Sequence, residues 1–554
     1  MSFCTPVRSQ TRQQIDHAKD RGASTVARDF LSRVWRVVRG ASSERATYAL
    51  VSILFLRALG VIYFIAFASL AAQMLGLYGS QGILPISDFM ARQSLDLVNV
   101  WFLPTVFWVN TSDLFLQAVP IVGALLSLLL VLGFYARMLR FVLFALYLSL
   151  VAAGQDFMAF QWDYLLLEVG FIAIFLGYSN LILWLYRWLL FRLMFLSGLV
   201  KILSGDPTWR NLTALDYHFE TQPLPNGIGF FVYHLPSGVH QFMVAATFLI
   251  ELVVPFFIFA PRRLRFAAGA LMVLLQAQIF LTGNYNFFNL LVIALCLLLL
   301  DDRALRTIPS AATKTPSLPA QTASLFSPLT RVGRFRVFVA ANLLARRFAI
   351  LIALVLFTLS AFQLLALLGV PTPGVVDLVG AVMEPLRVVN FYGPFAVMTT
   401  TRPEIVIEGS NDGEHWVAYE FKYKPGDTHR APPWVEPYQP RLDWQMWFAA
   451  LHVRTGDARA LLPELRTNQA LLFYMDNYGV DAWFVNFLER LLQGSPQVLA
   501  LLDKNPFSDA PPRSIRARLY NYRFAAWDAP LTTGAWWARE ERGLYFPALT
   551  RGAQ

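Results

Sequence analysis

Long apolar blocks separated by short polar or basic segments run through about two thirds of the chain. A helix needs roughly 20 mainly apolar residues to cross the hydrocarbon core of a bilayer, which is about 30 Å thick. The blocks reach or approach that length, so the pattern predicts a polytopic α-helical membrane protein with about nine spans. The expected spans cover residues 47–75, 114–134, 141–153, 164–177, 181–203, 241–260, 266–282, 287–300 and 348–370.

Arginines gather in the segments on one side of these blocks. They occur in a polar tail at 1–46, in two short turns at 135–140 and 261–265, and in a linker at 301–347 that is rich in Arg, Pro, Ser and Thr. By the positive-inside rule these segments are expected in the cytoplasm. The first eight spans then form a membrane domain at 47–300, and the last span follows the linker.

The segments on the other side of the blocks carry few Lys or Arg residues, and they are 76–113, 154–163 and 204–239. An odd number of spans separates the tail from residues 371–554, so we expect that last part on the exterior face, either periplasmic or lumenal. The tail has no early apolar segment. We therefore expect no cleavable signal peptide, and a first span that acts as an uncleaved signal.

Composition excludes two classes of function. Only 15% of the 554 residues are charged, against about 25% in soluble chains. The net charge of +10 does not indicate nucleic-acid binding, because the arginines lie in short clusters between apolar blocks. Of the two cysteines, Cys4 lies in the tail and Cys296 inside an apolar block, so thiol–disulfide chemistry through cysteines of its own is excluded.

Residues 371–554 have a different pattern, which predicts an α+β domain containing a small β-sheet. Residues 404–408 alternate in polarity and lead into an Asn-Asp-Gly sequence, which is a hairpin signal because Asn and Gly tolerate positive φ. Residues 416–424 would supply the return strand, and 513–524 alternate again as a late strand. Between them, 443–502 has a helical pattern.

Ionisable residues inside the apolar blocks are candidates for function, because a charge in a membrane is costly. Lys201, near the end of the fifth block, would act as a base if desolvation lowered its pKa, or would simply extend to the interface. Glu251 lies inside the sixth block and Glu168 inside the fourth. An intramembrane glutamate usually pairs with another group, and Lys201 is a candidate partner for Glu251.

The loop between the fifth and sixth blocks carries a second group of candidates. His218 flanked by carboxylates would suit acid–base chemistry or metal binding. His234 and His240 lack zinc-type spacing to it, so no metal site is expected, and a loop that folds back onto the membrane face is the favoured interpretation. The residues of this loop motif are Asp216, Tyr217, His218, Glu220, Gln222 and Pro223.

Common cofactor and hydrolase motifs are absent from the sequence. The chain has no GxGxxG, no P-loop, no GxSxG and no HExxH, so neither a bound cofactor nor a hydrolase site is expected. It also lacks paired halves with matching broken helices, which argues against a transporter.

Several long segments carry a distinctive order of residues. Two of them are WRNLTALDYHFETQPLPNGIGFFVYHLP at 209–236 and IELVVPFFIFAPRRLR at 250–265. Others are GNYNFFNLLVI, VNFYGPFAVMTTTRPEIVIEGSNDG and PYQPRLDWQMWFAAL. In order and content these segments resemble the lipase maturation factor family over nearly the whole chain.

This resemblance implies a membrane-bound, chaperone-like maturation factor. Animal members lie in the endoplasmic reticulum membrane, where they help secreted lipases reach an active fold, and their C-terminal region faces the lumen. The implied partners are an exported client protein, expected to be a lipase, and membrane lipids. The short linker and the arginine-rich tail suit a bacterial member, for which the inner membrane replaces the endoplasmic reticulum.

A second, shorter likeness concerns GLVKILSGDPTWRNLTALDYH at 198–218. Its layout is similar to the membrane module of vitamin K-dependent gamma-carboxylases, in which a lysine at the place of Lys201 is the catalytic base. Such enzymes place a partner histidine in the region that corresponds to 154–163, and this chain has none there.

Two hypotheses about function follow. As a maturation factor, the chain would hold its client through the loop motif and through exposed aromatic side chains, unless these tryptophans form a core. As a membrane enzyme, Lys201 would be the base, with His218 or Glu251 as its partner, on a lipid or quinone-like substrate. The candidate aromatic anchors are Trp434, Trp444, Trp447, Trp536 and Trp537.

Overall fold

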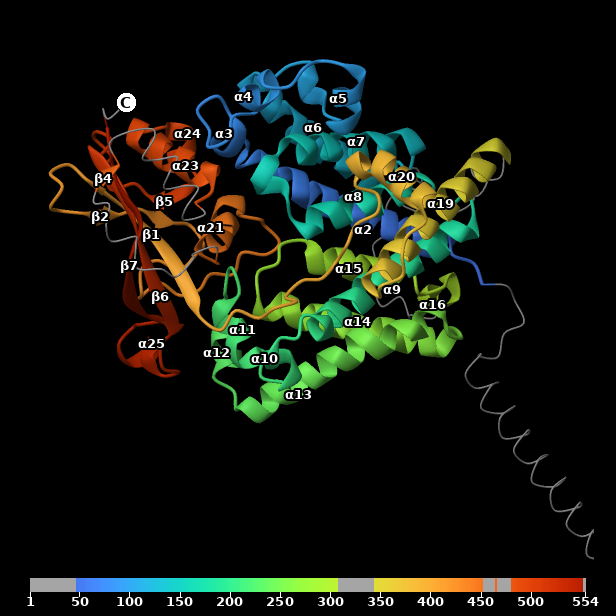
Figure 1. Cartoon of the computed structure of the whole chain (residues 1–554). Coiled ribbons are helices and arrows are strands. Elements are labelled where there is room, and N and C mark those ends of the chain that lie inside the picture. Colours follow the sequence, from blue (N-terminus) through green and yellow to red (C-terminus); the bar gives the residue numbers. More distant parts are fainter. Residues whose placement is uncertain (1–45, 307–342, 452–463, 466–479, 552–554) are drawn as a thin grey trace, which may run out of the picture.

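The molecule has two parts, a bundle of helices and a C-terminal part built on a β-sheet (Figure 1). The tail expected at 1–46 lies outside the described residues except for Ala46, and so does most of the linker expected at 301–347. The computed structural model describes residues 46–306, 343–451, 464–465 and 480–551.

Within the described residues, six helical segments are long and apolar enough to cross a membrane, with 20 to 25 residues each. Large aliphatic and aromatic side chains are exposed along their outer faces, as expected for helices in contact with lipid. The six are α2 (Ala49–Ala71), α6 (Asp113–Leu132), α9 (Asn180–Leu203), the continuous path of α13 (Ser237–Phe248), η3 (Leu249–Val253) and η4 (Val254–Phe259), α14 (Arg262–Thr282) and α19 (Leu343–Leu367).

Three further apolar blocks form helices that are shorter than a full span. They are α7 (Arg137–Ala153), α8 (Gln161–Ile174) and α15 (Phe288–Leu297), with 17, 14 and 10 residues. At 1.5 Å per residue they are about 26, 21 and 15 Å long, less than the hydrocarbon thickness of about 30 Å. The expected count of nine spans is therefore not confirmed, although every predicted block is helical.

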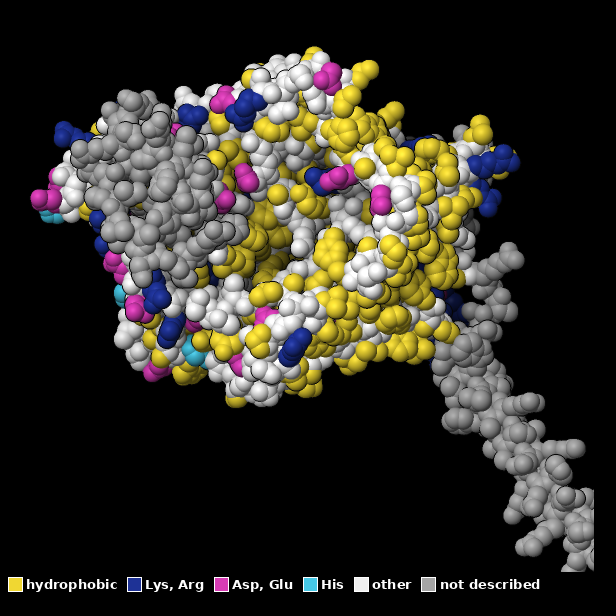
Figure 2. Space-filling model, viewed as in Figure 1, with side chains coloured by type: hydrophobic (Ala, Val, Ile, Leu, Met, Phe, Trp, Pro, Cys, Tyr) yellow, Lys and Arg dark blue, Asp and Glu magenta, His cyan; other side chains and the backbone are white. Residues whose placement is uncertain are grey.

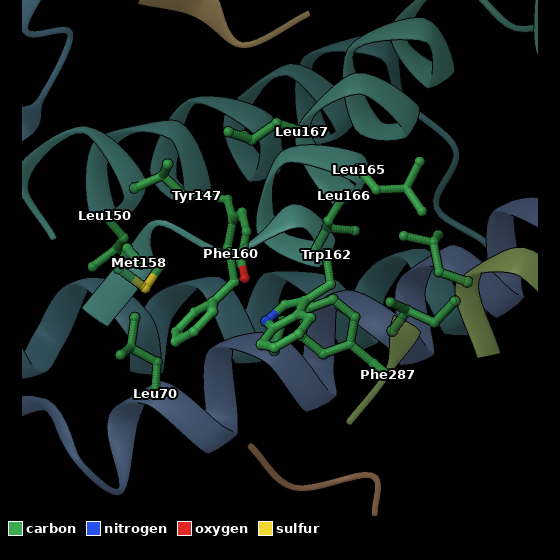
Figure 3. Close-up of a cluster of buried hydrophobic side chains, with 14 of the residues drawn as sticks. Leu70, Tyr147, Leu150, Met158, Phe160, Trp162, Leu165, Leu166, Leu167 and Phe287 are labelled. Atoms are coloured by element: carbon green, nitrogen blue, oxygen red, sulfur yellow. The ribbon is translucent and has the colours of Figure 1, made fainter. Parts of the chain in front are cut away.

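Aromatic side chains fill the core between α2, α7 and α8 (Figure 3). Tyr147 on α7 packs edge-on against Phe67 on α2, with 5.3 Å between the ring centroids. Phe160 and Trp162, where α8 begins, stack at 4.6 Å. Trp162 also meets Trp444 of the C-terminal part at 4.7 Å, so one continuous core joins the two parts.

Two adjacent aspartates join the end of α15 to the starts of α2 and α14. The carboxylate of Asp302 accepts hydrogen bonds from the backbone N–H groups of residues 49–51 at 2.9–3.1 Å. It thereby caps α2 and places a negative charge at the positive end of its dipole. Asp301 pairs with Arg262 on α14, with 2.6 Å between Oδ2 and Nε. The short helix α15 therefore returns the chain to the side on which α2 begins.

The C-terminal part packs against the opposite end of the bundle. The carbonyl of Gln439 accepts hydrogen bonds from Gln73 Nε2 at 2.7 Å and from Ser69 Oγ at 3.2 Å, both near the end of α2. Arg441 forms a fully buried bidentate ion pair with Asp163 on α8, with both N–O distances at 2.9 Å. The C-terminal part is thus fixed beside the Lys/Arg-poor loops.

In the part of the chain that the structure describes, five strands form the main sheet, in the order β2-β1-β6-β7-β4. β1 pairs antiparallel with β2 and β6, β6 pairs antiparallel with β7, and β4 joins β7 in parallel. The β1–β2 hairpin turns at the predicted Asn-Asp-Gly sequence, where Gly413 has a φ of +81°, which glycine adopts without strain. The strands are β1 (Arg402–Ser410), β2 (Val417–Ala418), β4 (Glu464–Leu465), β6 (Ser514–Phe524) and β7 (Trp537–Thr550), with β3 (Glu420–Phe421) and β5 (Leu502–Lys504) in a separate two-stranded sheet.

Parts of this domain differ from the sequence prediction. The return strand expected over 416–424 is divided into β2 and β3, which belong to different sheets. β7 is not predicted at all, because Arg-Glu-Glu-Arg at 539–542 is solvent-exposed and hides the strand alternation. Of the helical stretch expected over 443–502, residues 452–463 and 466–479 lie outside the described residues. The rest contains α21 (Arg441–Leu451), α23 (Ala482–Gln493) and α24 (Pro496–Leu499).

Short helices fill the connections between the spans and the strands. α20, which follows the last span, buries none of its residues, and Trp101 of α5 donates to the Val382 carbonyl of α20 at 3.1 Å. The bounds are α3 (Met74–Tyr78), α4 (Ile86–Ala91), α5 (Leu97–Phe102), η1 (Val106–Trp108), η2 (Gln155–Met158), α10 (Pro207–Arg210), α11 (Leu215–Thr221), α12 (Gly227–Tyr233), α16 (Asp302–Arg306), α20 (Gly374–Met383), η5 (Glu384–Leu386) and α25 (Ala529–Thr532).

Candidate functional site

A cavity of about 500 Å³ lies where the bundle meets the C-terminal part. Its wall is formed by α9, α14, α15 and the start of α8 from the bundle, by α11 from the loop, and by α21 from the C-terminal part. Figure 2 shows the viewed face hollowed between the two parts, with hydrophobic side chains around the hollow. The candidate residues that line the cavity are Lys201, His218, Pro223, Glu251, Trp444 and Trp447.

Lys201 and Glu251 form a buried ion pair in this wall. Lys201 lies in the last turn of α9, and Glu251 lies in η3, a π-helical turn inside the span that begins at Ser237. The Nζ atom of Lys201 is 2.8 Å from Oε2 and 3.0 Å from Oε1 of Glu251. Its third contact is the Ser197 carbonyl at 2.9 Å. The pairing that the sequence suggests is therefore present, and an ammonium group has three N–H donors in all.

A glycine on α9 allows this pair to form. A Cβ atom at Gly198 would lie 2.8 Å from the side chain of Leu252 and 2.9 Å from Cβ of Glu251. Such contacts are too short for any larger residue, so α9 and η3 approach each other as closely as they do because position 198 has no side chain. Trp209 covers the pair from the loop side, with its ring centre 5.2 Å from Lys201 Nζ.

His218 lies in the same wall but forms no hydrogen bond with Lys201 or Glu251. Its Nε2 atom is 3.2 Å from the hydroxyl of Tyr285, and its ring meets Phe395 at 4.9 Å. Burial, together with the positive charge of Lys201, lowers the pKa of the imidazole to about 4. His218 is therefore neutral at pH 7, and desolvation is the main cause.

The carboxylates that flank His218 in the sequence point elsewhere. Asp216 Oδ1 lies 2.7 Å from Nδ1 of His240, and Asp216 Oδ2 accepts from Ser237 at 2.9 Å. Glu220 accepts a hydrogen bond from the backbone N–H of Phe524 at 2.8 Å. The described residues hold no group of three or more His, Cys, Asp or Glu side chains placed to bind a metal ion.

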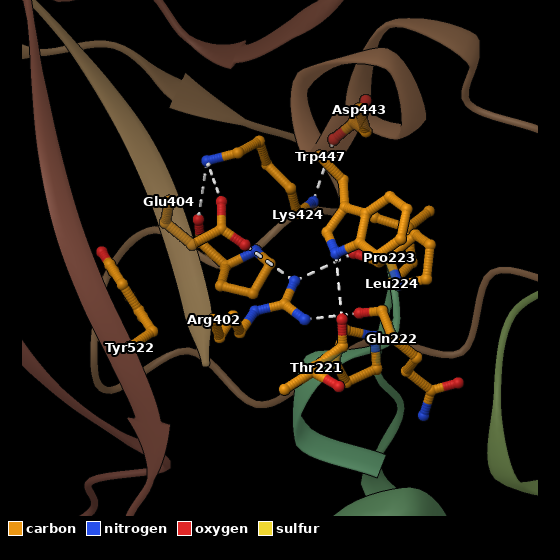
Figure 4. A network of polar contacts seen from close by, with 12 residues as sticks. Thr221, Gln222, Pro223, Leu224, Arg402, Glu404, Lys424, Asp443, Trp447 and Tyr522 are labelled. Carbon is orange, nitrogen blue, oxygen red and sulfur yellow. Dashed lines mark hydrogen bonds and ion pairs between the residues drawn. The ribbon is translucent and has the colours of Figure 1, made fainter. Parts of the chain in front are cut away.

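The second half of the loop motif binds an arginine from the sheet (Figure 4). Arg402 on β1 donates to the carbonyls of Glu220 at 2.8 Å, of Gln222, and of Pro223 at 2.9 Å. Its guanidinium also pairs with Glu404 at 2.7 Å. Carbonyl acceptors in fixed positions suit the planar fork of an arginine, so this residue joins the loop to the sheet.

Glu404 forms a second ion pair, with Lys424, through its other carboxylate oxygen. Lys424 Nζ lies 2.9 Å from Glu404 Oε2, and all three charged groups of the network are almost completely buried. Neither Arg402 nor Lys424 is among the candidates that the sequence suggests. The signal in the sequence is a charged pair, Arg402 and Glu404, on alternate positions of a strand whose neighbours are apolar.

The tryptophans expected as client anchors have different environments. Trp444 and Trp447 on α21 are buried, and Trp447 donates to the carbonyl of Thr221 at 2.9 Å. Trp537 is buried as well, whereas Trp536 is half-buried and Trp434 is 45% exposed. Of the two alternatives that the sequence leaves open, an exposed anchor or a core position, the structure shows the core position for Trp444, Trp447 and Trp537, because the three rings pack at the junction of the two parts or against the sheet.

Glu168 has the structural role that its position suggests. It forms a buried ion pair with Arg192 of α9. It also accepts from the hydroxyl of Tyr392 at 2.7 Å and from the backbone N–H of Asn390 at 3.2 Å. This pair attaches the segment after the last span to the middle of the bundle.

Most of the chain matches known protein-family models. The family model described as the lipase maturation factor transmembrane domain matches residues 50–307. The model described as the lipase maturation factor C-terminal domain matches residues 388–472 and 464–547. The matched segments include the cavity wall and the sheet that carries Arg402.

Individual relatives agree with these matches. The chain is 36% identical to lipase maturation factor 2 of Homo sapiens, over 90% of this chain and 82% of that protein. It is 34% identical to lipase maturation factor 1 of Bos taurus, over 93% and 91% of the two chains. It is also 34% identical to lipase maturation factor 1 of Mus musculus, over 99% and 94%. No solved structure matches the chain.

Proposed function

The chain belongs to the lipase maturation factor family, and from that premise we propose that it is a membrane-bound chaperone for exported client proteins, with a lipase as the client. The matched relatives are named as lipase maturation factors, and the chain is a multi-pass membrane protein with a water-facing sheet domain. No catalytic step is needed for this role. The protein would stabilise a folding intermediate of its client by covering apolar surface.

The observation that carries the proposal is an exposed aromatic patch where α12 meets the C-terminal part, which we call the Phe231 patch. It consists of Phe231 from α12 and of Trp527 and Trp536 from the β6–β7 connection. Phe231 lies 6.3 Å from the ring of Trp527 and 6.3 Å from that of Trp536. Phe231 and Trp527 are 47% and 61% exposed. Exposed aromatic clusters mark protein-binding sites, and aromatic anchors dominate such contacts.

The loop motif would support this surface. Tyr217 is exposed and is the residue of the motif best placed to touch a client. Asp216 fixes the start of the next span through His240. Glu220, Gln222 and Pro223 are buried at the junction, where they would position α12 and therefore Phe231. Trp444 and Trp447 would act in the same indirect way, by holding α21 against the bundle.

We infer the orientation in the membrane from the arginines and from the packing. The tail and the linker are cytoplasmic by the positive-inside rule, and the C-terminal part is exterior. In support, the C-terminal part packs on the end of the bundle that carries the Lys/Arg-poor loops, and Asp302 places the end of α15 at the start of α2. The protein would reside in a bacterial inner membrane, or in the endoplasmic reticulum membrane of a eukaryotic cell, in contact with membrane lipids.

Substitutions in the Phe231 patch test the proposal. Cells would carry either Phe231→Ser with Trp527→Ser, or the control Val417→Ser, which removes an exposed apolar side chain from strand β2. We expect exported lipase to lose most of its specific activity with the double substitution and to keep it with the control. Full lipase activity with the double substitution, at an equal amount of membrane protein, would contradict the proposal.

The second candidate function is a membrane enzyme with Lys201 as the base and His218 or Glu251 as its partner, acting on a lipid or quinone-like substrate. The location of all three residues in one cavity wall favours it. Against it, Lys201 has its three N–H groups engaged by Ser197 and Glu251. A base must offer a free lone pair, so the enzyme would have to break this ion pair first. The maturation role is therefore the better supported function.

A further inference from the structure

The helix α20, which follows the last span, carries an apolar stripe that no described part of the protein covers. Its four members recur at positions i, i+3, i+4 and i+7, which share one face of a helix. In a water-soluble domain such a stripe faces the core. Here all four side chains are exposed, at 68%, 65%, 36% and 48% for Val375, Leu378, Val379 and Val382.

A second exposed apolar helix contacts α20. The indole N–H of Trp101 on α5 donates to the carbonyl of Val382 at 3.1 Å. α5 buries none of its residues, and its large apolar side chains are as exposed as those of α20. Figure 2 shows hydrophobic side chains gathered over this side of the molecule. We define the α5–α20 surface as Leu97, Val98 and Phe102 of α5 with Val375, Leu378, Val379 and Val382 of α20.

The position of α20 beside the last span indicates what covers this surface. The span α19 ends at Leu367, yet a Cβ atom at Gly380 would lie 3.9 Å from the side chain of Leu359. Leu359 comes eight residues before the end of α19, which is about 12 Å along the helix axis. α20 therefore packs on the flank of α19 (Figure 1) and does not extend into water beyond it. The flank of a span is covered by lipid.

The chain after α20 is also held within the membrane domain. The backbone N–H of Asn390 and the hydroxyl of Tyr392 donate to Oε2 of Glu168, at 3.2 Å and 2.7 Å. Glu168 pairs with Arg192, which lies near the midpoint of the span α9. α20 is thus fixed beside the bundle by the span before it and by the segment after it.

The distribution of charge on the two helices suits the edge of a bilayer. α5 contains no charged residue, and its cap, Asp96, accepts from the backbone N–H of Asn99 at 2.7 Å. The only charged residue of α20 is Asp377, which lies on the side opposite the stripe and accepts from Thr372 at 2.6 Å. An apolar stripe, a polar opposite side and a neighbouring tryptophan are typical of helices that lie in the membrane interface.

We propose that α5 and α20 form a membrane anchor, in which the α5–α20 surface inserts among the acyl chains of the leaflet next to the C-terminal part. Both helices belong to segments that the sequence assigns to the exterior face, so the proposal moves them from water into the edge of the bilayer. It goes beyond the maturation role and does not depend on a client. The chain continues from α20 to β1, so the anchor would fix the distance of the sheet from the membrane.

Spin labels test whether this surface faces acyl chains. Cys4→Ser with Cys296→Ala gives a background without cysteines, into which Leu97→Cys or Leu378→Cys is introduced in the full-length protein. Each nitroxide-labelled protein is reconstituted into phosphatidylcholine vesicles. Its collisions are measured with oxygen, which concentrates among acyl chains, and with a neutral nickel(II) chelate, which stays in water. We expect both labels to collide mainly with oxygen.

Two further labels provide the references. Leu354→Cys lies on the exposed face of α19 and represents lipid, whereas Val417→Cys lies on β2 and represents water. We expect the labels of the α5–α20 surface to match Leu354→Cys. Labels that match Val417→Cys would overturn the proposal and would leave the surface free for a client. Labels that collide with neither reagent would overturn it as well, because another protein chain would then cover the surface.

Labels along α20 test how the helix is oriented. Val375→Cys and Val382→Cys should resemble Leu378→Cys, whereas Asp377→Cys should give a several-fold higher ratio of nickel to oxygen collisions, because it lies opposite the stripe. The same ratio at all four positions would contradict an inserted stripe. All four side chains are exposed, so the labels leave the core unchanged, and gel filtration of each variant checks that it is folded.

Discussion

The ammonium group of Lys201 lies 2.8 Å from Oε2 and 3.0 Å from Oε1 of Glu251, and both side chains are buried. The two residues are 50 positions apart in the sequence, and they join α9 to a π-helical turn in the neighbouring span. Since the remaining N–H of Lys201 is bound by the Ser197 carbonyl, the pair is complete. Its geometry favours a structural role, and this interpretation can be tested against the catalytic one.

Breaking the Lys201–Glu251 pair should destabilise the protein, and removing both charges should restore most of the lost stability. Lys201→Met leaves an uncompensated carboxylate, which costs roughly 3–5 kcal/mol in a buried site. Lys201→Met with Glu251→Leu removes that penalty, so we expect the Tm in detergent to fall in the single variant and to recover most of the loss in the double variant. A single variant that unfolds at the natural Tm would contradict a structural pair. A stable double variant that has lost all function would favour the enzyme.

Arg402 should contribute much more to stability than a surface arginine of the same sheet. Arg402→Met deprives three loop carbonyls of their donor and leaves Glu404 with Lys424 alone, so we expect a loss of about 3–5 kcal/mol. The control is Arg518→Ala, whose pair with Glu541 is partly exposed, and a solvent-accessible pair of this kind is worth about 0–1 kcal/mol. Thermal unfolding of both variants measures the difference, and equal Tm values would show that the Arg402 network does not hold the two parts together.

Asp302 should stabilise the first span as its cap. Asp302→Ala removes three accepted backbone hydrogen bonds at the start of α2, and loss of a cap typically costs about 0.5–2 kcal/mol. The matched control is Asp96→Ala, which removes the cap of α5, a helix with no buried residues. We expect a lower Tm for the first variant and an unchanged Tm for the second. A Tm that is unchanged for Asp302→Ala and lowered for Asp96→Ala would contradict this role of Asp302.

Glu436 should make the stability depend on pH. Burial raises the pKa of its carboxyl group from 4.5 to about 9, so the folded chain holds a proton that the unfolded chain releases above pH 4.5. The contribution of this group is fully present below about pH 4.5, and it is lost as the pH rises to 9, with a slope of at most about 1.4 kcal/mol per pH unit.

Glu436→Gln removes this titration and keeps an oxygen that can accept from the backbone N–H of Tyr285. We expect the Tm of the variant to exceed that of the natural protein by a margin that grows from pH 5 to pH 9. A margin that is constant across this range would show that Glu436 does not titrate as described.

The sequence predicts the coarse architecture, because its signals are local. Each apolar block is helical, and the Asn-Asp-Gly turn and the strand at 514–524 are present. The span count is less predictable, since α7, α8 and α15 each bury more than half of their residues in the bundle. A short apolar helix that packs against its neighbours need not cross the bilayer to keep its apolar side chains out of water. β7 is missed for a related reason, because the charged residues at 539–542 face solvent and conceal the strand.

Contacts within the candidate site can be predicted from the sequence only where a charged residue has few possible partners of opposite charge. Glu251 has few possible cations near it in the membrane, so Lys201 can be proposed from the sequence. Arg441 and Asp163 are 278 residues apart, and no local pattern indicates that they meet. The burial of Trp444 and Trp447 cannot be predicted from the sequence either, because a tryptophan in an amphipathic helix suits a buried junction and an exposed anchor equally well.

The central claim is that this protein acts on the folding of an exported lipase, and the most direct test is the specific activity of that lipase in cells that lack the gene. Activity is measured per unit of exported lipase protein, so that secretion and folding are separated. We predict that specific activity falls while the exported amount stays the same, and that the natural gene restores it. Unchanged specific activity and unchanged export would contradict the claim, and lipases would then not be the clients of this protein.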